Sequence, residues 1–285
     1  MKIILSSDVE LWSWNRNFSQ DIEKGVIKLI EFANKEKIPI TFFISLSDKG
    51  YWEKDYLKKI ILLMKKLDGE GIEFGVHSHC KNLPLEFPTL SDNLKDYPLD
   101  QAVKIIKWYK KQLEKILKKN IRVHRAGGYQ IPSPNTLSRI FNTTGLKIDS
   151  SALEVEYSSP RKFRNLIEIS PATNKKYSKK LIVWGPEQMS NKELLKFYKK
   201  AKTKTKVLVI NFHSFSVHGF LGKKAKIWHK LPNWLRKILR PFTKKFKENS
   251  KNNLESESPH FKNLKKIIRF LKEQECEFVK FKDFL

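Results

Sequence analysis

The chain has 285 residues, enough for one large domain or two smaller ones, each with a core of its own. Its content of 40% hydrophobic and 12% aromatic residues excludes an intrinsically disordered chain. The net charge of +27 favours an anionic partner such as nucleic acid, an acidic polysaccharide or an anionic membrane surface, although a merely solvated basic surface gives the same count. Two cysteines, Cys80 and Cys276, are too few for a disulfide framework in a chain of this length.

The first ten residues, MKIILSSDVE, contain a short apolar run and no small-residue cleavage site, so we expect no secretory signal. No apolar run approaches the roughly 20 residues that a membrane-spanning helix needs. These features predict a cytoplasmic protein that contacts a membrane, if at all, from the inner face.

Short apolar segments alternate with amphipathic segments along the chain. The pattern predicts strands at 2–7, 38–45, 72–76, 121–124, 146–151, 166–170, 181–184, 207–212 and 277–281. It predicts helices at 21–35, 51–67, 99–119, 133–144, 191–202 and 261–272. This alternation is typical of an α/β fold with a largely parallel sheet.

Polar residues recur where the predicted strands end. The first strand ends at Asp8 and Glu10, the third at His77 and His79, the fourth at Arg125, and a late strand at His213. Within each pair the spacing of two residues places both side chains on one face of an extended strand. Because parallel strands present their carboxyl ends at one rim, four such strands favour a barrel-like arrangement over an open sheet.

This set of side chains matches the needs of a metal-dependent hydrolase. Two imidazoles and a carboxylate can bind one divalent metal, and a second carboxylate can act as a base. A neighbouring arginine keeps that base ionised, and a histidine across the site can protonate the leaving group. The sequence has neither a glycine-rich phosphate loop nor a Gly-x-Ser-x-Gly nucleophile motif, which disfavours nucleotide and serine-hydrolase chemistry.

The motifs, in this order, resemble those of the polysaccharide deacetylases of carbohydrate esterase family 4. They are Ser-Ser-Asp8-Val-Glu10, Glu-x-Gly-x-His77-Ser-His79, His-Arg125-Ala-Gly-Gly-Tyr129, Asp149-Ser-Ser and Asn-Phe-His213-Ser. The resemblance implies a distorted (β/α) barrel of about seven repeats and metal-dependent removal of acetyl groups from sugars. It implies a metal bound by His77, His79 and either Asp8 or Glu10, with zinc as the first candidate and cobalt, nickel or iron as alternatives.

The resemblance also assigns roles to single residues. Asp8 matches the general base, Arg125 the residue that supports it, and His213 the general acid. The backbone around Gly128 matches the segment that donates an N–H to the oxyanion. From their places in the motifs, Tyr129, Asp149 and Lys81 are expected to contact the substrate.

The sequence departs from the family pattern at two positions. Val9 stands where the family has a second aspartate, so the resemblance leaves Asp8 and Glu10 as alternative metal carboxylates. Lys81 stands where the family has its second metal histidine, four residues after His77, and His79 is the nearby substitute. If His79 cannot reach the metal, Lys81 would place an ammonium there and the site would be inactive.

Residues 217–250 combine many lysines with aromatic and aliphatic residues. Such a segment suits an anionic membrane interface, and equally an insertion packed over the barrel rim with solvated lysines. We therefore expect a single domain over residues 1–285 with a basic, aromatic insertion at about 217–258.

The leading hypothesis is a cytoplasmic, metal-dependent deacetylase that acts on an acetamido sugar, lipid-linked or nucleotide-linked, in polysaccharide or glycolipid biosynthesis. The alternative is a catalytically degenerate module with the same fold that binds an anionic glycan or a membrane surface. Specific nucleic-acid binding fits the charge but has no motif to support it.

Overall fold

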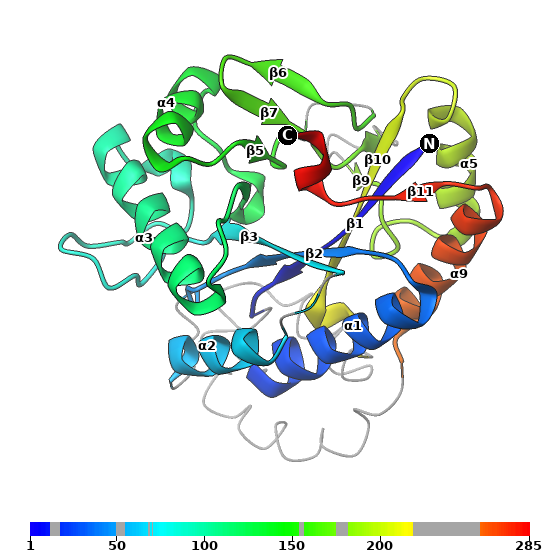
Figure 1. Ribbon diagram of the computed structural model, residues 1–285, viewed down its shortest axis with the longest axis horizontal. Coiled ribbons are helices and arrows are strands. Elements are labelled where there is room, and N and C mark those ends of the chain that lie inside the picture. The colour runs from blue at the N-terminus through cyan, green and yellow to red at the C-terminus, as the bar shows by residue number, and fades with distance from the viewer. Residues whose placement is uncertain are drawn as a thin grey trace, which may run out of the picture.

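A computed structural model of the chain describes residues 1–11, 18–49, 55–67, 69, 71–153, 157–174, 182–218 and 257–285. It confirms the predicted α/β fold with a mostly parallel sheet. The sheet curls into a half-barrel with helices around its outside (Figure 1). In the described part of the chain no helix is both long and apolar enough to cross a membrane.

The main sheet has the strand order β10-β1-β2-β3-β4-β5-β7-β6, with β11 also paired to β1. Its strands are β1 (Lys2–Val9), β2 (Ile40–Ile44), β3 (Ile72–Ser78), β4 (Val123–Ala126), β5 (Ile148–Asp149), β6 (Arg161–Phe163), β7 (Leu166–Glu168), β10 (Val207–His213) and β11 (Glu277–Phe278). All pairs are parallel except β6 with β7. A second sheet pairs β8 (Thr173–Asn174) with β9 (Ile182–Val183).

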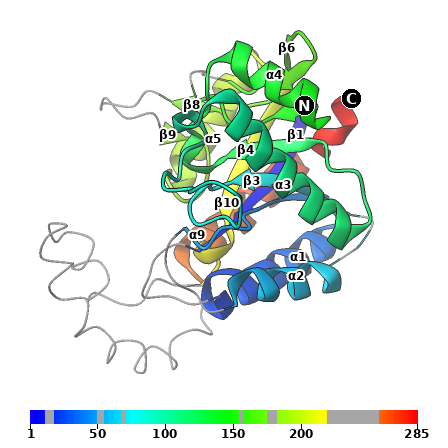
Figure 2. The ribbon, with the colours of Figure 1, turned by 90° about the vertical axis from the view of Figure 1, so that its left-hand side faces the viewer.

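The helices are π-helical η1 (Ser19–Glu23), α1 (Lys24–Glu36), α2 (Tyr56–Lys66), α3 (Leu99–Leu117), α4 (Pro134–Thr144), α5 (Asn191–Ala201) and α9 (Pro259–Glu273), with 3₁₀ turns η2 (Leu94–Asp96), η3 (Gly127–Tyr129), η4 (Ser214–Ser216) and η7 (Phe281–Phe284). Figure 1 shows α3 and α4 on one side of the strands, α1 and α2 below them, and α5 and α9 on the other side. The view in Figure 2 again places α1 and α2 together on one face.

Local sequence sets several helix boundaries. The Ser133 side chain accepts a hydrogen bond from the Thr136 N–H, and Pro134 occupies the first turn of α4, where its missing N–H costs nothing. Gly145 ends α4 at a φ of 76°, a left-handed conformation that glycine adopts without strain. These signals explain why the predicted bounds of α4 agree closely with the structure.

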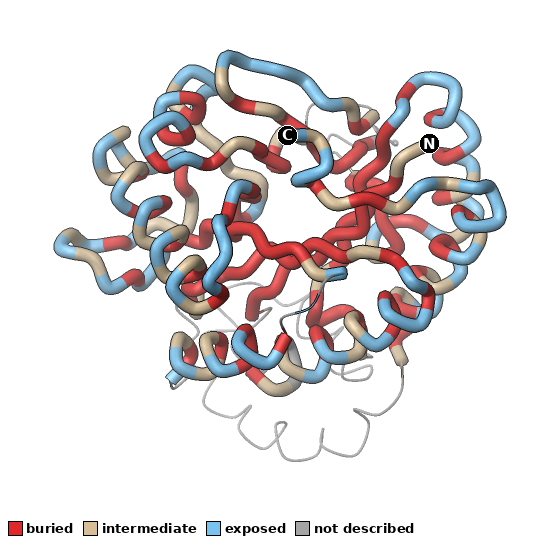
Figure 3. Tube along the Cα trace, in the orientation of Figure 1, coloured by how far each residue is buried: buried red, intermediate tan, exposed pale blue. Residues whose placement is uncertain are grey.

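The core has two parts. Apolar side chains of the outer strand faces pack against the helices, and Figure 3 shows burial concentrated on the strands and on the inward faces of the helices. A smaller cluster fills the inside of the curled sheet and includes Ile4, Phe43, Val209 and Phe281. Phe281 belongs to η7, so the last turn of the chain packs into the barrel interior.

Three elements differ from the sequence-based expectation. β6 and β8 are not predicted because β6 is short, charged and exposed and β8 is two residues long. The final strand is shorter than predicted because the chain turns into η7 at Phe281. Most of the predicted insertion, at 219–256, lies outside the described residues.

Candidate active site

Parallel pairing brings the polar strand ends together. In the register of β1 with β10, Asp8 pairs with His213, and in that of β3 with β4, His77 pairs with Arg125. Since β1, β3, β4 and β10 all end at the same rim, residues up to 205 positions apart in sequence meet there. The predicted convergence of strand-end residues is therefore seen in the structure.

Glu10, His77 and His79 form a buried cluster that could hold a metal ion. One ligand atom from each lies within 4.8 Å of the others. The His77 Nε2 is 3.4 Å from Glu10 Oε2, and the His79 Nε2 contacts the same oxygen. Two imidazole nitrogens and one carboxylate oxygen are a typical donor set for a catalytic zinc ion. The spacing of two residues thus brings His79 to the same cluster as His77.

Hydrogen bonds fix which nitrogen of each histidine faces the cluster. The His77 Nδ1 lies 3.0 Å from the carbonyl oxygen of Arg125, which can only accept, so Nδ1 carries the proton. The His79 Nδ1 likewise donates to Asp92 Oδ2, at 2.7 Å. Both Nε2 atoms are therefore directed at Glu10. Metal-binding histidines usually donate their other ring N–H to a carbonyl or carboxylate oxygen, which fixes the orientation of the ring.

Burial and neighbouring charges set the protonation of this cluster. The His79 Nε2 contacts Glu10, and although burial lowers the pKa of His79, the charge of Glu10 raises it overall. Burial lowers the pKa of His77, which favours the neutral ring that a metal requires. Burial alone would raise the pKa of Glu10, but the charges of Lys49 and His79 outweigh it, so the pKa lies well below its usual value. The donor set thus has one ionised carboxylate and one imidazole that favours its neutral form.

Asp8 lies beside the cluster and is held by Arg125. Arg125 Nη1 donates to Asp8 Oδ1 at 2.7 Å, and the Asn211 side-chain amide donates to Asp8 Oδ2 at 2.8 Å. Burial would raise the pKa of Asp8, but the charges of Arg125, His77 and His213 lower it to about 2. Asp8 is therefore ionised at neutral pH, with both oxygens already engaged.

Arg125 is itself fully buried and its guanidinium is fully bonded. Besides Asp8 it donates to Ser6 Oγ, to Asn211 Oδ1 and to both the side chain and the carbonyl of Ser150. Its guanidinium carbon lies 4.1 Å from the centre of the Phe43 ring. This network fixes Asp8 relative to the barrel interior.

His213 approaches both carboxylates from β10. Its Nε2 lies 3.7 Å from Asp8 Oδ2 and 3.7 Å from Glu10 Oε1. The His213 Nδ1 donates to Glu187 Oε2 at 2.6 Å, and its backbone N–H donates to Glu187 Oε1 at 2.9 Å. Burial lowers the pKa of His213, but the charge and hydrogen bond of Glu187 raise it to about 9. His213 is therefore protonated at neutral pH.

A small cavity of about 30 Å³ lies next to His213. It is lined by Tyr129, Val183, Gly185, Glu187, Gln188, Asn211 and His213. The Tyr129 hydroxyl accepts a hydrogen bond from the Asn211 amide at 2.7 Å. Gly128 and Tyr129 have φ angles of 56° and 59°, so the turn after β4 is left-handed at both residues. The backbone predicted to stabilise an oxyanion is thus in a tight turn at the rim.

Searches by sequence found no matching family model and no matching curated protein. Comparison of structures did find similar proteins. A probable polysaccharide deacetylase from Pseudomonas aeruginosa PAO1 has a TM-score of 0.57 at 10% identity, covering 99% of this chain and 88% of its own. A peptidoglycan N-acetylglucosamine deacetylase, crystallised with an N-hydroxybenzamide compound, has a TM-score of 0.52 at 14% identity, covering 98% and 86%.

The chain has the fold of the CE4 polysaccharide deacetylases. A CE4 family pseudoenzyme from Bacillus anthracis is also similar, with a TM-score of 0.50 at 11% identity, covering 99% of this chain. The present chain spans 64% of the length of that protein. The resemblance in motif order and the observed fold therefore agree.

On this CE4 fold, Glu10 and not Asp8 completes the candidate metal cluster. The cluster found among the described residues contains Glu10, His77 and His79, whereas the oxygens of Asp8 face Arg125 and Asn211. The two carboxylates that the sequence left as alternatives are thus distinguished by their neighbours.

Lys81 was expected to place an ammonium in the site only if His79 could not reach it, and His79 does reach the cluster. Lys81 is exposed, and what it contributes is a backbone carbonyl that accepts a hydrogen bond from the Ser47 hydroxyl. Lys49 instead supplies the ammonium, with its Nζ 3.1 Å from Glu10 Oε2. Whether Lys81 contacts a substrate stays a prediction.

The expected substrate contact of Asp149 does not fit its position. Asp149 has no exposed surface and lies among His124, Ser151 and Glu168. His124 Nδ1 donates to Asp149 at 2.6 Å, and the Ser78 hydroxyl lies 2.8 Å from His124 Nε2. Burial lowers the pKa of His124 to about 3 and raises that of Asp149 to about 6. Asp149 therefore joins strands β3, β4, β5 and β7 in a buried polar cluster.

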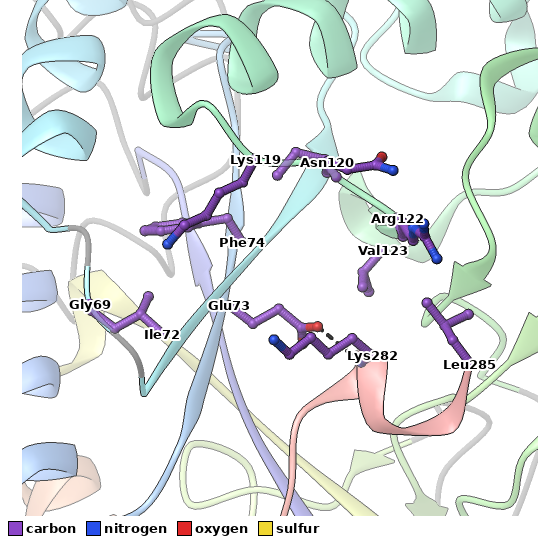
Figure 4. Close-up of a pocket in the computed structure, with 11 residues that line it drawn as sticks. Gly69, Ile72, Glu73, Phe74, Lys119, Asn120, Arg122, Val123, Lys282 and Leu285 are labelled. Carbon is purple, nitrogen blue, oxygen red and sulfur yellow. Dashed lines mark hydrogen bonds between the residues drawn. The ribbon is translucent and has the colours of Figure 1, made fainter.

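A cavity of about 640 Å³ lies at the other end of the strands from the metal cluster. Figure 4 shows its lining, including the starts of β3 and β4, Lys119, Arg122 and the C-terminal turn. Glu73 points toward η7 there and accepts hydrogen bonds from the backbone N–H groups of Phe281 and Lys282 and from the Thr41 hydroxyl. This cavity is remote from the cluster of Glu10, His77 and His79. Glu73 stabilises the C-terminal turn through these hydrogen bonds.

Sequence reasoning missed four residues that complete the site. They are Lys49, Asp92, Glu187 and Asn211. Asn211 lies two residues before His213 on β10, so the period-two argument used for the histidines would have found it. Lys49 lies five residues after the end of β2, between regular elements. Asp92 and Glu187 lie between regular elements and carry no periodic signal.

Proposed function

We propose that the chain is a metal-dependent hydrolase that removes acetyl groups from an acetamido sugar. The observation that carries the proposal is the Glu10, His77 and His79 cluster directly beside an ionised Asp8 and a protonated His213. Similar structures described as a polysaccharide deacetylase and a peptidoglycan deacetylase support the same reaction class.

Glu10, His77 and His79 would hold a divalent ion, with zinc as the first choice for this donor set. Such an ion would polarise the acetyl carbonyl and lower the pKa of water. The described residues fit this role because both histidines direct Nε2 inward and the carboxylate is ionised.

Asp8 would act as the general base. Its pKa of about 2 keeps it ready to accept a proton from the attacking water, and Arg125 keeps it oriented. A carboxylate with so low a pKa is a weak base, so the attacking water must be made more acidic. A bound ion would lower the pKa of that water. The backbone N–H groups of Gly128 and Tyr129 would stabilise the oxyanion.

His213 would act as the general acid. Its Nε2 proton faces the carboxylates, and Glu187 stabilises the imidazolium from the Nδ1 side. Protonation of the departing amine nitrogen would complete cleavage of the amide bond. Asp8 and His213 thus have pKa values pushed apart by their neighbours, as expected for a base and an acid in one site.

The test is deacetylation of N-acetylglucosamine oligomers by the purified protein, with Zn²⁺ or Co²⁺ and with a chelator. We expect metal-dependent acetate release that Asp8→Asn and His77→Ala each reduce by at least about 10³-fold. Acetate release that survives both substitutions would contradict the assignment. A lipid-linked or nucleotide-linked acetamido sugar is the proposed natural substrate, and the same assay on such donors tests it.

A second candidate function is a catalytically degenerate module that binds an anionic glycan or membrane surface. Lys49 favours it, because its ammonium already neutralises the carboxylate that a metal would need. The similar Bacillus anthracis protein is described as a pseudoenzyme. This function predicts no stoichiometric metal, and glycan binding that weakens steeply with salt.

We also propose that the protein is cytoplasmic and that residues 217–250 bind the inner membrane face. The mixture of basic and aromatic residues in this segment supports the proposal. Cosedimentation with vesicles containing an anionic lipid, against vesicles of a zwitterionic lipid alone, tests it. Equal binding to both would contradict it.

A further inference from the structure

Lys49 is held in an unusual way at the edge of the metal cluster. Its φ of 57° is a left-handed conformation that a lysine rarely adopts. The turn is fixed by hydrogen bonds: the Lys49 N–H donates to Ser47 Oγ at 3.0 Å, and the Ser47 hydroxyl donates to the carbonyl of Lys81. The backbone therefore directs this side chain at the rim instead of leaving it to move freely in solvent.

The Lys49 ammonium shares one oxygen atom with the proposed metal ligands. Its Nζ lies 3.1 Å from Glu10 Oε2, the oxygen that is 3.4 Å from His77 Nε2 and in contact with His79 Nε2. The Lys49 side chain is 15% exposed and that of Glu10 8%. An ion pair this sheltered from water is screened little, so its charge acts strongly on anything else that binds Glu10.

We infer that Lys49 competes with the divalent ion for Glu10. In the metal-free protein the ammonium neutralises the buried carboxylate, and metal binding displaces it toward solvent. Two cations that compete for one carboxylate each weaken the binding of the other. Lys49 therefore lowers the affinity for the metal and stabilises the metal-free protein. The inference rests on the proposed function, because it takes the bound ion to be a divalent metal.

The test is titration of Zn²⁺ into the metal-free protein by isothermal calorimetry, together with thermal unfolding of the metal-free form. Lys49→Met removes the charge and keeps an unbranched side chain that is one atom shorter. We expect it to tighten Zn²⁺ binding about tenfold and to lower the melting temperature of the metal-free protein. Lys49→Arg keeps the charge, and we expect its affinity to stay near that of the wild type.

Lys81→Met is the matched control, since it removes the same charge from an exposed lysine in a neighbouring loop. We expect it to leave both measurements unchanged. Wild-type binding with equal or weaker binding by Lys49→Met would overturn the inference and leave the proposed function standing. Binding by Lys49→Met alone would support the inference while refuting a metal-dependent wild type. Stoichiometric binding by neither protein would overturn both.

Discussion

Alanine at position 127 should disturb the metal site without removing any ligand. A Cβ at Gly127 would lie 2.5 Å from His79 Nδ1 and 2.6 Å from its Cε1, both far inside van der Waals contact. The ring cannot retreat freely, because its Nδ1 is bonded to Asp92 at 2.7 Å and its Nε2 contacts Glu10. His79 must therefore move by an appreciable fraction of an ångström, and one of these contacts is lost.

The expected cost follows from that displacement. Loss of an outer partner of a metal-binding histidine weakens metal binding by about 10–100-fold. The overpacking itself should lower the free energy of unfolding by about 1–3 kcal/mol. Calorimetric titration with Zn²⁺ measures the first effect, and urea denaturation of the metal-free protein measures the second.

Gly71→Ala is the control for this experiment. An added Cβ at Gly71 has no atom within 4 Å among the described residues, so the substitution adds the same methyl group without a clash. We expect it to leave metal affinity and stability unchanged. A Gly127→Ala protein that binds Zn²⁺ as tightly as the wild type would refute the idea that Gly127 and Asp92 clamp His79 in place.

Three further predictions concern groups around the site. Activity should fall as pH rises through about 9, because His213 then loses its proton. Glu187→Gln removes the charge that raises the pKa of His213, so it should move this fall to lower pH in a profile of kcat/KM against pH. Arg125→Met should lower the free energy of unfolding by about 3–5 kcal/mol, because it removes the guanidinium that pairs with the buried Asp8. Asp8→Asn in that background should recover part of the loss in urea denaturation. Glu73→Ala should lower the same free energy by about 2–4 kcal/mol, because the N–H groups of Phe281 and Lys282 lose their acceptor, while Zn²⁺ affinity stays unchanged.

Each of these has a result that would count against it. If activity falls at the same high pH in Glu187→Gln as in the wild type, a group other than His213 donates the proton. Additive effects of Arg125→Met and Asp8→Asn would mean that the two residues do not interact. Weakened Zn²⁺ binding by Glu73→Ala would mean that the far end of the barrel is coupled to the site.

The sequence predicted the fold and the centre of the site because both depend on short-range periodicity. Asp8 with Glu10, and His77 with His79, share a strand face through the period of two, and their strands end at one rim. The order of strands in the barrel and the pairing of Asp8 with His213 depend on long-range register, which periodicity does not contain.

Motif order does not give the direction of a side chain. The order of Lys81 and Asp149 in the motifs does not tell which face of a turn or strand each side chain occupies. Lys81 is exposed, and Asp149 pairs in register with His124 and is buried with it in a polar cluster. Lys49 and Asp92 reach the cluster from segments between regular elements, where neither propensity nor periodicity determines direction.

The central claim is that Glu10, His77 and His79 form a metal site. Its most direct test is the zinc content of the full chain after loading and dialysis, compared between wild type and His79→Ala, with His260→Ala as a histidine control outside the cluster. We predict one zinc ion per chain for the wild type and His260→Ala, and a clear loss for His79→Ala. A wild type without stoichiometric zinc, or a His79→Ala protein that retains it in full, would contradict the claim.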